Sequence, residues 1–238
     1  MGHDHDHHSH SYGLEFEHGK NTAFIVGICL NSAFVLAEIT GGLIYNSMAL
    51  LTDAGHNASD VASLILSLVA FKMAEKKSSA VYTYGYKKTT VLAALTNSVI
   101  LFIAIGILGY ESVTRLLKPE KVAGGVIAWI ASAGIVVNSI SAYLFYRNRK
   151  KELNVKAAYL HLLTDALVSI GVVAAGIIII YTEWYWLDPA IGLIIMIIIL
   201  ISAWKLLRDS FKMTIDAVPS GMELEEIKRI ILQVNHVK

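Results

Sequence analysis

The chain is poor in charged residues and almost devoid of cysteine. Of its 238 residues only 16% are Asp, Glu, Lys or Arg, and 55% are hydrophobic, whereas soluble domains average roughly 25% charged residues. Cys29 is the only cysteine, which excludes an internal disulfide and a cysteine-based zinc module. The formal net charge of +1 provides no basic surface large enough to neutralise many phosphates, so no nucleic-acid partner is expected. This composition indicates a polytopic membrane protein.

Six long apolar segments follow the first twenty residues. Each is long enough to cross ~30 Å of hydrocarbon as a helix. The strands of a membrane barrel would alternate apolar and polar residues, whereas stretches such as 176–181 and 191–201 are continuously apolar. The sequence therefore predicts an all-α membrane protein with six transmembrane helices, over residues 22–45, 47–73, 89–117, 124–146, 155–181 and 187–207.

Lysine and arginine are distributed unevenly between the two sides of these segments. Ten lie in or beside the connections after the second and fourth segments, and three lie near the connections on the other side. Because short loops rich in Lys and Arg stay in the cytoplasm, we expect both termini to be cytoplasmic. The ten are Lys72, Lys76, Lys77, Lys87, Lys88, Arg147, Arg149, Lys150, Lys151 and Lys156, and the three are Arg115, Lys118 and Lys121.

The pattern His-x-x-x-Asp occurs twice, at His56/Asp60 and His161/Asp165, inside the second and fifth segments. Residues four apart share one face of a helix, and a charged group at mid-bilayer costs about 2.5–3.5 kcal/mol. Asp60 lies ~20 Å and Asp165 ~15 Å along its helix at 1.5 Å per residue, so the two pairs reach similar depths. Any one of these residues alone could be an interhelical hydrogen-bonding group. Together they predict one four-ligand metal site, provided that the two helices touch.

This donor set favours zinc, which accepts tetrahedral nitrogen and oxygen ligands. Two neutral imidazoles and two carboxylates carry a charge of minus two, so a bound divalent cation leaves a nearly neutral site and lowers the cost of buried charge. Protons displace metals from such ligands. The pattern therefore indicates a site at which the metal exchanges.

Further polar residues lie within the predicted helices. Asp53 shares the helix face of His56. It is interpreted as a residue that supports the ligands or lines their cavity. The alternatives are that Asp53 is itself a ligand in another state, or that it is a polar group near the outer mouth. Glu38 could have the same supporting role. For Glu38, Asn31, Asn97 and Asn138, interhelical hydrogen bonds are favoured over metal contact. Glu111 is placed to pair with Arg115 at i+4.

Three stretches resemble a known family: NSMALLTDAGHNASD at 46–60, YTYGYKK at 82–88 and AAYLHLLTDALVSIG at 157–171. They resemble the signature blocks of the cation diffusion facilitator family, in its zinc-transporting, bacterial cobalt-zinc-cadmium resistance type. The resemblance implies a metal–proton antiporter of the bacterial inner membrane that works by alternating access, usually as a homodimer, with Zn²⁺ as the transported substrate and Cd²⁺ or Co²⁺ as alternatives. It places the ligands on His56, Asp60, His161 and Asp165, and a His at the position of His56 is associated with zinc or cadmium.

Other classes of protein are less consistent with the sequence. A primary pump would need a phosphate-binding loop, and no G-x-x-x-x-G-K-[ST] pattern occurs. A membrane metallohydrolase could use Asp53 or Glu38 as a base, but there is no H-E-x-x-H. A passive channel would conduct metal without any dependence on pH. Secondary active transport is therefore favoured over the metalloenzyme and the channel.

The two ends of the chain differ from the transport domain predicted over residues 21–211. Residues 1–20 are predicted to form a disordered cytoplasmic tail that gathers metal weakly through His3, His5, His7, His8 and His10, with a purification tag as the alternative. Ser220 and Glu223 have capping-box spacing. Residues 212–238 are therefore interpreted as a linker and the first helix of a truncated cytoplasmic α+β domain.

Overall fold

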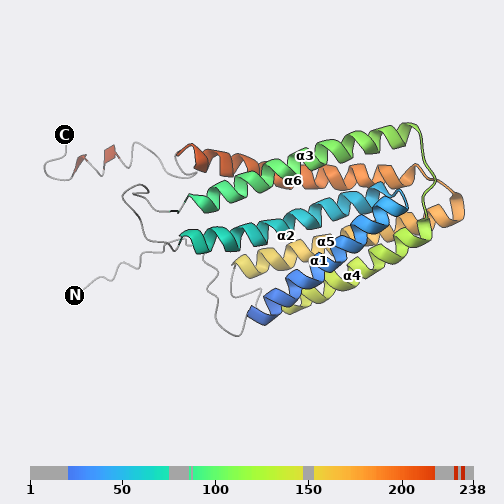
Figure 1. The fold of residues 1–238 in the computed structure, drawn as a ribbon, viewed down its shortest axis with the longest axis horizontal. Coiled ribbons are helices and arrows are strands. Elements are labelled where there is room, and N and C mark those ends of the chain that lie inside the picture. Colours follow the sequence, from blue (N-terminus) through green and yellow to red (C-terminus); the bar gives the residue numbers. More distant parts are fainter. Residues whose placement is uncertain are drawn as a thin grey trace.

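The chain folds into six long α-helices connected in sequence order (Figure 1). The computed structural model describes residues 21–74, 86, 88–146, 153–217, 228–229 and 232–233. Within these ranges there is no strand, and the prediction of a helical protein is confirmed for them. The helices are α1 (Asn21–Ile44), α2 (Met48–Ala74), α3 (Thr89–Leu117), α4 (Gly124–Tyr146), α5 (Leu153–Thr182) and α6 (Leu187–Thr214).

The predicted helix boundaries hold within about two residues, except at the end of α6. This helix continues to Thr214, seven residues beyond the predicted end at 207. Its last turns carry Lys205, Arg208, Asp209 and Lys212, so a search for apolar runs ends before the helix does. The histidine-rich segment 1–20 and the capping box near Ser220 lie outside the described residues.

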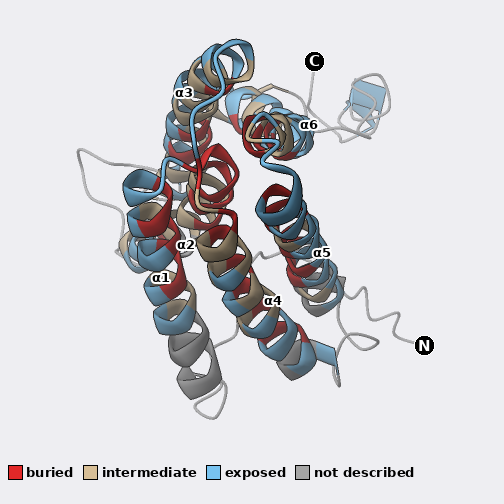
Figure 2. Cartoon of the chain, turned by 90° about the vertical axis from the view of Figure 1, so that its right-hand side faces the viewer, coloured by how far each residue is buried: buried red, intermediate tan, exposed pale blue. Residues whose placement is uncertain are grey.

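Helices α3, α4, α5 and α6 are long and apolar enough to cross a membrane, over Thr89–Leu117, Gly124–Tyr143, Tyr159–Thr182 and Leu187–Thr214. The apolar stretch described in α1, Ile28–Ile44, is shorter, and α2 carries the polar residues of the motif. Large apolar side chains cover the outside, for example Trp129 at 81% exposure, while Glu38, Asp53 and Asp165 are buried. In Figure 2 the buried residues face the space between the helices. This inside-out distribution indicates a multi-pass membrane protein.

Two packing units make up the bundle. Helices α4 and α5 form a hairpin with the most extensive contact of any pair, and α2 packs against α1, α3 and α6. The hairpin meets the other unit mainly where α4 touches α1 and α5 touches α6, whereas the backbones of α2 and α5 have little contact. The connections 45–47, 118–123 and 183–186 lie at one end, called here the short-loop end (Figure 1). The first turn of α1 and the last turn of α6 lie at the other, the termini end.

Asp188 joins α6 to the first turn of α2 at the short-loop end. Its carboxylate accepts hydrogen bonds from Ser47 Oγ at 2.5 Å and from the backbone N–H of Met48 at 2.6 Å. These bonds satisfy donors that the start of a helix leaves unpaired. Arg115 of α3 donates to the carbonyl of Asn46 at 2.7 Å, so α2, α3 and α6 are fastened at this end.

We expect Asp188→Ala to destabilise the protein by about 1–3 kcal/mol, because it leaves the buried donors of α2 without an acceptor. The free energy of unfolding of detergent-solubilised protein, from a denaturant titration, is the measurement. Ser47→Ala is the comparison: it removes the hydroxyl bond to Asp188 and the bond that Ser47 Oγ accepts from the backbone N–H of Leu50 at 3.2 Å, but it leaves the backbone N–H of Met48 paired, so its effect should be smaller. Equal effects would show that Asp188 does not cap α2.

The hairpin is held together by close backbone contact at two glycines. A Cβ built on Gly176 would lie 2.7 Å from the carbonyl oxygen of Gly124 and 2.9 Å from the backbone nitrogen of Ala128. Glycine therefore lets α4 and α5 approach more closely than any other residue would, as small residues do between membrane helices.

We expect Gly176→Ala to cost about 1–3 kcal/mol, because the added methyl group meets backbone that cannot yield. Thermal unfolding in detergent measures the loss. Gly171→Ala is a matched control in the same helix, since a Cβ there would meet nothing within 4 Å. The close contact would be unimportant if the two variants unfolded at the same temperature.

Candidate metal centre

The two His-x-x-x-Asp pairs come together where α2 and α5 face each other. Each of the four residues offers one ligand atom, and these atoms all lie within 4.8 Å of one another. His161 Nε2 is 2.9 Å from Asp60 Oδ2, and His56 Nε2 is 3.5 Å from Asp165 Oδ1. The two imidazoles meet edge to face, with ring centroids 5.5 Å apart. We call these four residues the quartet.

The spacing of the donor atoms fits a tetrahedral ion. Metal–ligand bonds of 2.0–2.1 Å in a tetrahedron place neighbouring ligand atoms about 3.3 Å apart. His56 Nε2 and Asp60 Oδ2 are 3.6 Å apart, as are His161 Nε2 and Asp165 Oδ2, so the close donor distances of 2.9–3.6 Å bracket the ideal edge. Small side-chain movements would suffice to enclose one cation.

The quartet is more accessible from one side than from the other. The side chains of His161 and Asp60, which lie one turn nearer the termini end, are 44% and 36% exposed. Those of His56 and Asp165, one turn nearer the short-loop end, are only 18% and 7% exposed. The part of the cluster nearer the termini end is therefore more exposed than the part nearer the short-loop end.

Asp53 and Glu38 lie outside the quartet. Both are fully buried, at 2% and 0% exposure. The amide nitrogen of Asn57 donates to Glu38 Oε2 at 3.0 Å and ties α2 to α1 directly beside His56. Their position next to the quartet is compatible with the predicted supporting role.

The other predicted polar residues have mixed outcomes. The side-chain amide of Asn97 donates to Ser59 at 3.1 Å and to Ser63 at 2.5 Å, which confirms an interhelical bond between α3 and α2. Glu111 pairs with Arg115 at 2.9 Å, also as predicted. For Asn138, whose amide nitrogen is buried, the predicted bond is not found among the parts of the chain that are described.

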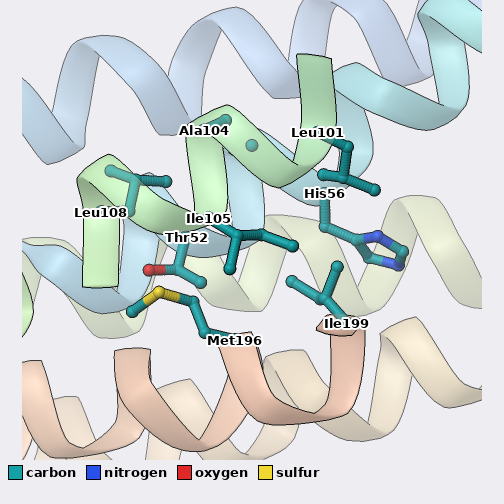
Figure 3. Close-up of a pocket in the computed structure, with 9 residues that line it drawn as sticks. Thr52, His56, Leu101, Ala104, Ile105, Leu108, Met196 and Ile199 are labelled. Atoms are coloured by element: carbon teal, nitrogen blue, oxygen red, sulfur yellow. The ribbon is translucent and has the colours of Figure 1, made fainter. Parts of the chain in front are cut away.

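A narrow cavity of about 10 Å³ adjoins His56 between α2, α3 and α6 (Figure 3). Its walls are almost entirely apolar, and its volume admits about one water molecule. A hydrated divalent ion does not fit in this cavity. The lining residues are Thr52, Gly55, His56, Leu101, Ala104, Ile105, Leu108, Met196 and Ile199.

Sequence reasoning missed two polar residues that shape this region. Asp188, at the start of α6, caps α2 from 140 positions away in the chain, and no local pattern reveals such a partner. Asn57 directly follows the first histidine of the motif, and a helical wheel places it off the face shared by His56 and Asp60, as a polar residue that faces a neighbour other than the second motif helix. That signal was available in the sequence.

The fold and the quartet define a polytopic helical membrane protein with a candidate site for a divalent cation. Residues 24–213 match the model of the cation efflux transmembrane domain. The chain belongs to the cation efflux (CDF) family, which confirms the resemblance found in the sequence motifs.

Several relatives are about one third identical to this chain over the aligned residues. It is 35% identical to the zinc transporter ZitB of Pectobacterium atrosepticum over 93% of this chain and 70% of that protein. It is equally identical to the cadmium, cobalt and zinc/H(+)-K(+) antiporter of Bacillus velezensis, over 90% and 69%. The metal cation efflux system protein CzcD of Cupriavidus metallidurans is also 35% identical, over 92% and 70%. These relatives are named as transporters, antiporters or efflux proteins, not as enzymes.

We expect Ala at any one of the four quartet positions to weaken divalent-cation binding by at least about 100-fold, because loss of even a residue that only supports a ligand costs 10–100-fold. Titration calorimetry of the purified protein gives the affinity, and the visible spectrum of bound Co²⁺ reports tetrahedral geometry. Glu120→Gln is the control, because it removes a carboxylate in the exposed connection 118–123, away from the quartet, and should leave the affinity unchanged. Unchanged affinity in the Asp165→Ala variant would rule out the quartet.

Proposed function

We propose that the protein exports Zn²⁺ from the cytoplasm in exchange for protons, through the quartet, by alternating access. The observation that carries this proposal is that four exchangeable donor atoms from two helices lie within 4.8 Å of one another. The names of the relatives support zinc as cargo, with Cd²⁺ and Co²⁺ as alternatives, and one of these names includes H⁺ antiport.

All six helices cross the membrane in this proposal. Helices α1 and α2 have 24 and 27 residues, which correspond to about 36 and 40 Å at 1.5 Å per residue. The basic residues Lys72, Lys88 and Lys205 lie toward the termini end, which favours a cytoplasmic location for that end. The short-loop end then faces outward, across the cell membrane of a bacterium. The resemblance to the family further favours a homodimer.

The charge of the quartet couples metal to protons. Two ionised carboxylates and two neutral imidazoles attract a divalent cation and form a nearly neutral complex with it. An empty quartet would retain a charge of minus two in a medium of low dielectric constant, which is unfavourable. Protons arriving from the more acidic exterior displace the cation and neutralise the carboxylates. The protonated carrier can then return inward and release its protons to the cytoplasm.

The structure has the features of the cytoplasm-facing state of this cycle. His161 and Asp60 are accessible from the termini end, whereas His56 and Asp165 are covered. Because α5 packs mainly on α4, and α2 packs on α1, α3 and α6, the quartet spans the boundary between the two packing units. A rocking movement of the hairpin against the other unit would close one side of the site and open the other.

We expect Asp60→Ala and Asp165→Ala to abolish zinc-driven proton flux in proteoliposomes, because each removes a carboxylate that binds zinc in one state and a proton in the other. A zinc dye and a pH dye inside the vesicles record both fluxes. Gly171→Ala, which adds a methyl group in open space of α5, is the control and should retain both.

The same assay separates an antiporter from a channel. In an antiporter, reversal of the pH gradient changes the rate and direction of zinc movement. A passive channel would conduct zinc down its own gradient whatever the pH gradient, and that result would contradict coupled exchange.

A further inference from the structure

A second pair of carboxyl groups lies beside the quartet, between α1 and α2. Asp53 lies one turn before Asn57 on the same face of α2, and Asn57 is the hydrogen-bond partner of Glu38 in α1. Both carboxyl groups are buried, at 0% exposure for Glu38 and 2% for Asp53, and they interact electrostatically. The amide of Asn57 donates to Glu38 Oε2 at 3.0 Å. In the described part of the chain no hydrogen bond or ion pair joins the two carboxyl groups to the quartet.

Each member of the pair has one oxygen atom without a partner. Glu38 Oε1 and Asp53 Oδ2 are buried, and no donor reaches either of them within the ranges that the structure describes. Two ionised carboxylates in contact repel each other, and burial makes the charge still more costly. A single proton on one of the two oxygens turns an acceptor into a donor and pairs both oxygens at once.

We propose that Glu38 and Asp53 hold one proton between them, at a site separate from the quartet, and release it when a divalent cation enters the quartet. This proposal rests on the proposed metal–proton exchange. On release, the O–H bond of the carboxyl group breaks with its electrons remaining on oxygen, and the proton passes to water. The pair thereby adds to the protons that the quartet itself exchanges.

The surroundings favour a proton over a metal ion as the ligand. The third polar group at the pair is the amide of Asn57, which presents N–H to Glu38 and would repel a cation. Hard cations such as Ca²⁺ take six to eight oxygen ligands and zinc takes four, and two carboxyl groups alone do not provide them. A proton needs only two oxygens.

The charges that act on the pair come from the quartet. His56 and Asp165 both interact electrostatically with it. Helix α4, which packs against α1, carries no Asp, Glu, His, Lys or Arg. Asp188 and the Glu111–Arg115 pair belong to the short-loop end, where Asp188 is already bonded to the start of α2.

The pair lies on the outer side of the quartet, close enough to respond to the charge of a cation bound there. Asp53 precedes His56 by three residues and is therefore ~4.5 Å nearer the short-loop end along α2. A divalent cation in the quartet adds positive charge on the cytoplasmic side of the pair and weakens its hold on the proton.

The test is to count protons released per zinc ion bound by the full chain in detergent, with a pH indicator in weakly buffered solution. Glu38→Gln keeps an acceptor for Asn57 and offers an N–H to Asp53, so the pair no longer carries a titrating proton. We expect this variant to bind zinc and to release about one proton fewer per ion than the wild type. Asp53→Asn, which offers its amide to Glu38, should behave alike. Glu120→Gln, in the exposed connection 118–123, is the control and should match the wild type.

Infrared difference spectra provide a second measurement. Zinc binding should remove the carbonyl stretch of protonated carboxyl groups, and the loss should be smaller in the Glu38→Gln spectra than in the wild type, because only the quartet carboxyl groups then contribute. An unchanged proton count in both variants, or an equal loss of the band in the wild type and in Glu38→Gln, would overturn the proposal and leave zinc exchange at the quartet intact. Loss of zinc binding in both variants would show instead that the pair belongs to the metal site. Failure of the wild type to bind zinc would refute the proposed function itself.

Discussion

The arrangement of this protein depends on the cost of charge in a medium of low dielectric constant. Asp60 and Asp165 are placed where an isolated carboxylate would be expensive, and each is in contact with imidazole nitrogen atoms from both helices. Glu38 and Asp53 solve the same problem by facing each other. The carboxylate of Asp188 is stabilised by hydrogen bonds from the hydroxyl of Ser47 and from the backbone N–H of Met48 in α2. Each buried carboxylate thus determines which helices must be neighbours.

This constraint explains why the bundle is organised in two units. Within a unit, the helices are joined by close backbone contacts and hydrogen bonds. Examples are the approach of Gly124 to Gly176 and the bond from Arg115 to the carbonyl of Asn46. Between α2 and α5 the backbones have little contact, and polar side chains meet there instead. The proposed ion site therefore lies where the packing is weakest. This is where a conformational change requires the least rearrangement of the apolar core.

The sequence was sufficient for the helices and for the quartet because both depend on local patterns. Apolar runs of membrane length mark the helices, and the i, i+4 spacing of His56 with Asp60 places two ligands on one face. The end of α6 was predicted seven residues too early, because its last turns carry charged residues where a helix leaves the apolar layer. The pairing of Asp188 with Ser47, and of Glu38 with Asp53, depends on which helices are adjacent in space. A single sequence without homologues does not contain that information.

The separation of the bundle into two units has a mechanical consequence. If the hairpin rotates as one body, Asp165 and His161 move by a distance equal to the rotation angle multiplied by their distance from the pivot. A tilt of roughly 5° about a point ~15 Å away along α5 shifts these ligands by about 1.3 Å, which is large compared with metal–ligand bonds of about 2 Å. Capture and release of the ion would then need only a few degrees of rotation. An ion bound by all four ligands would join the hairpin to the other packing unit and hold them in one relative position.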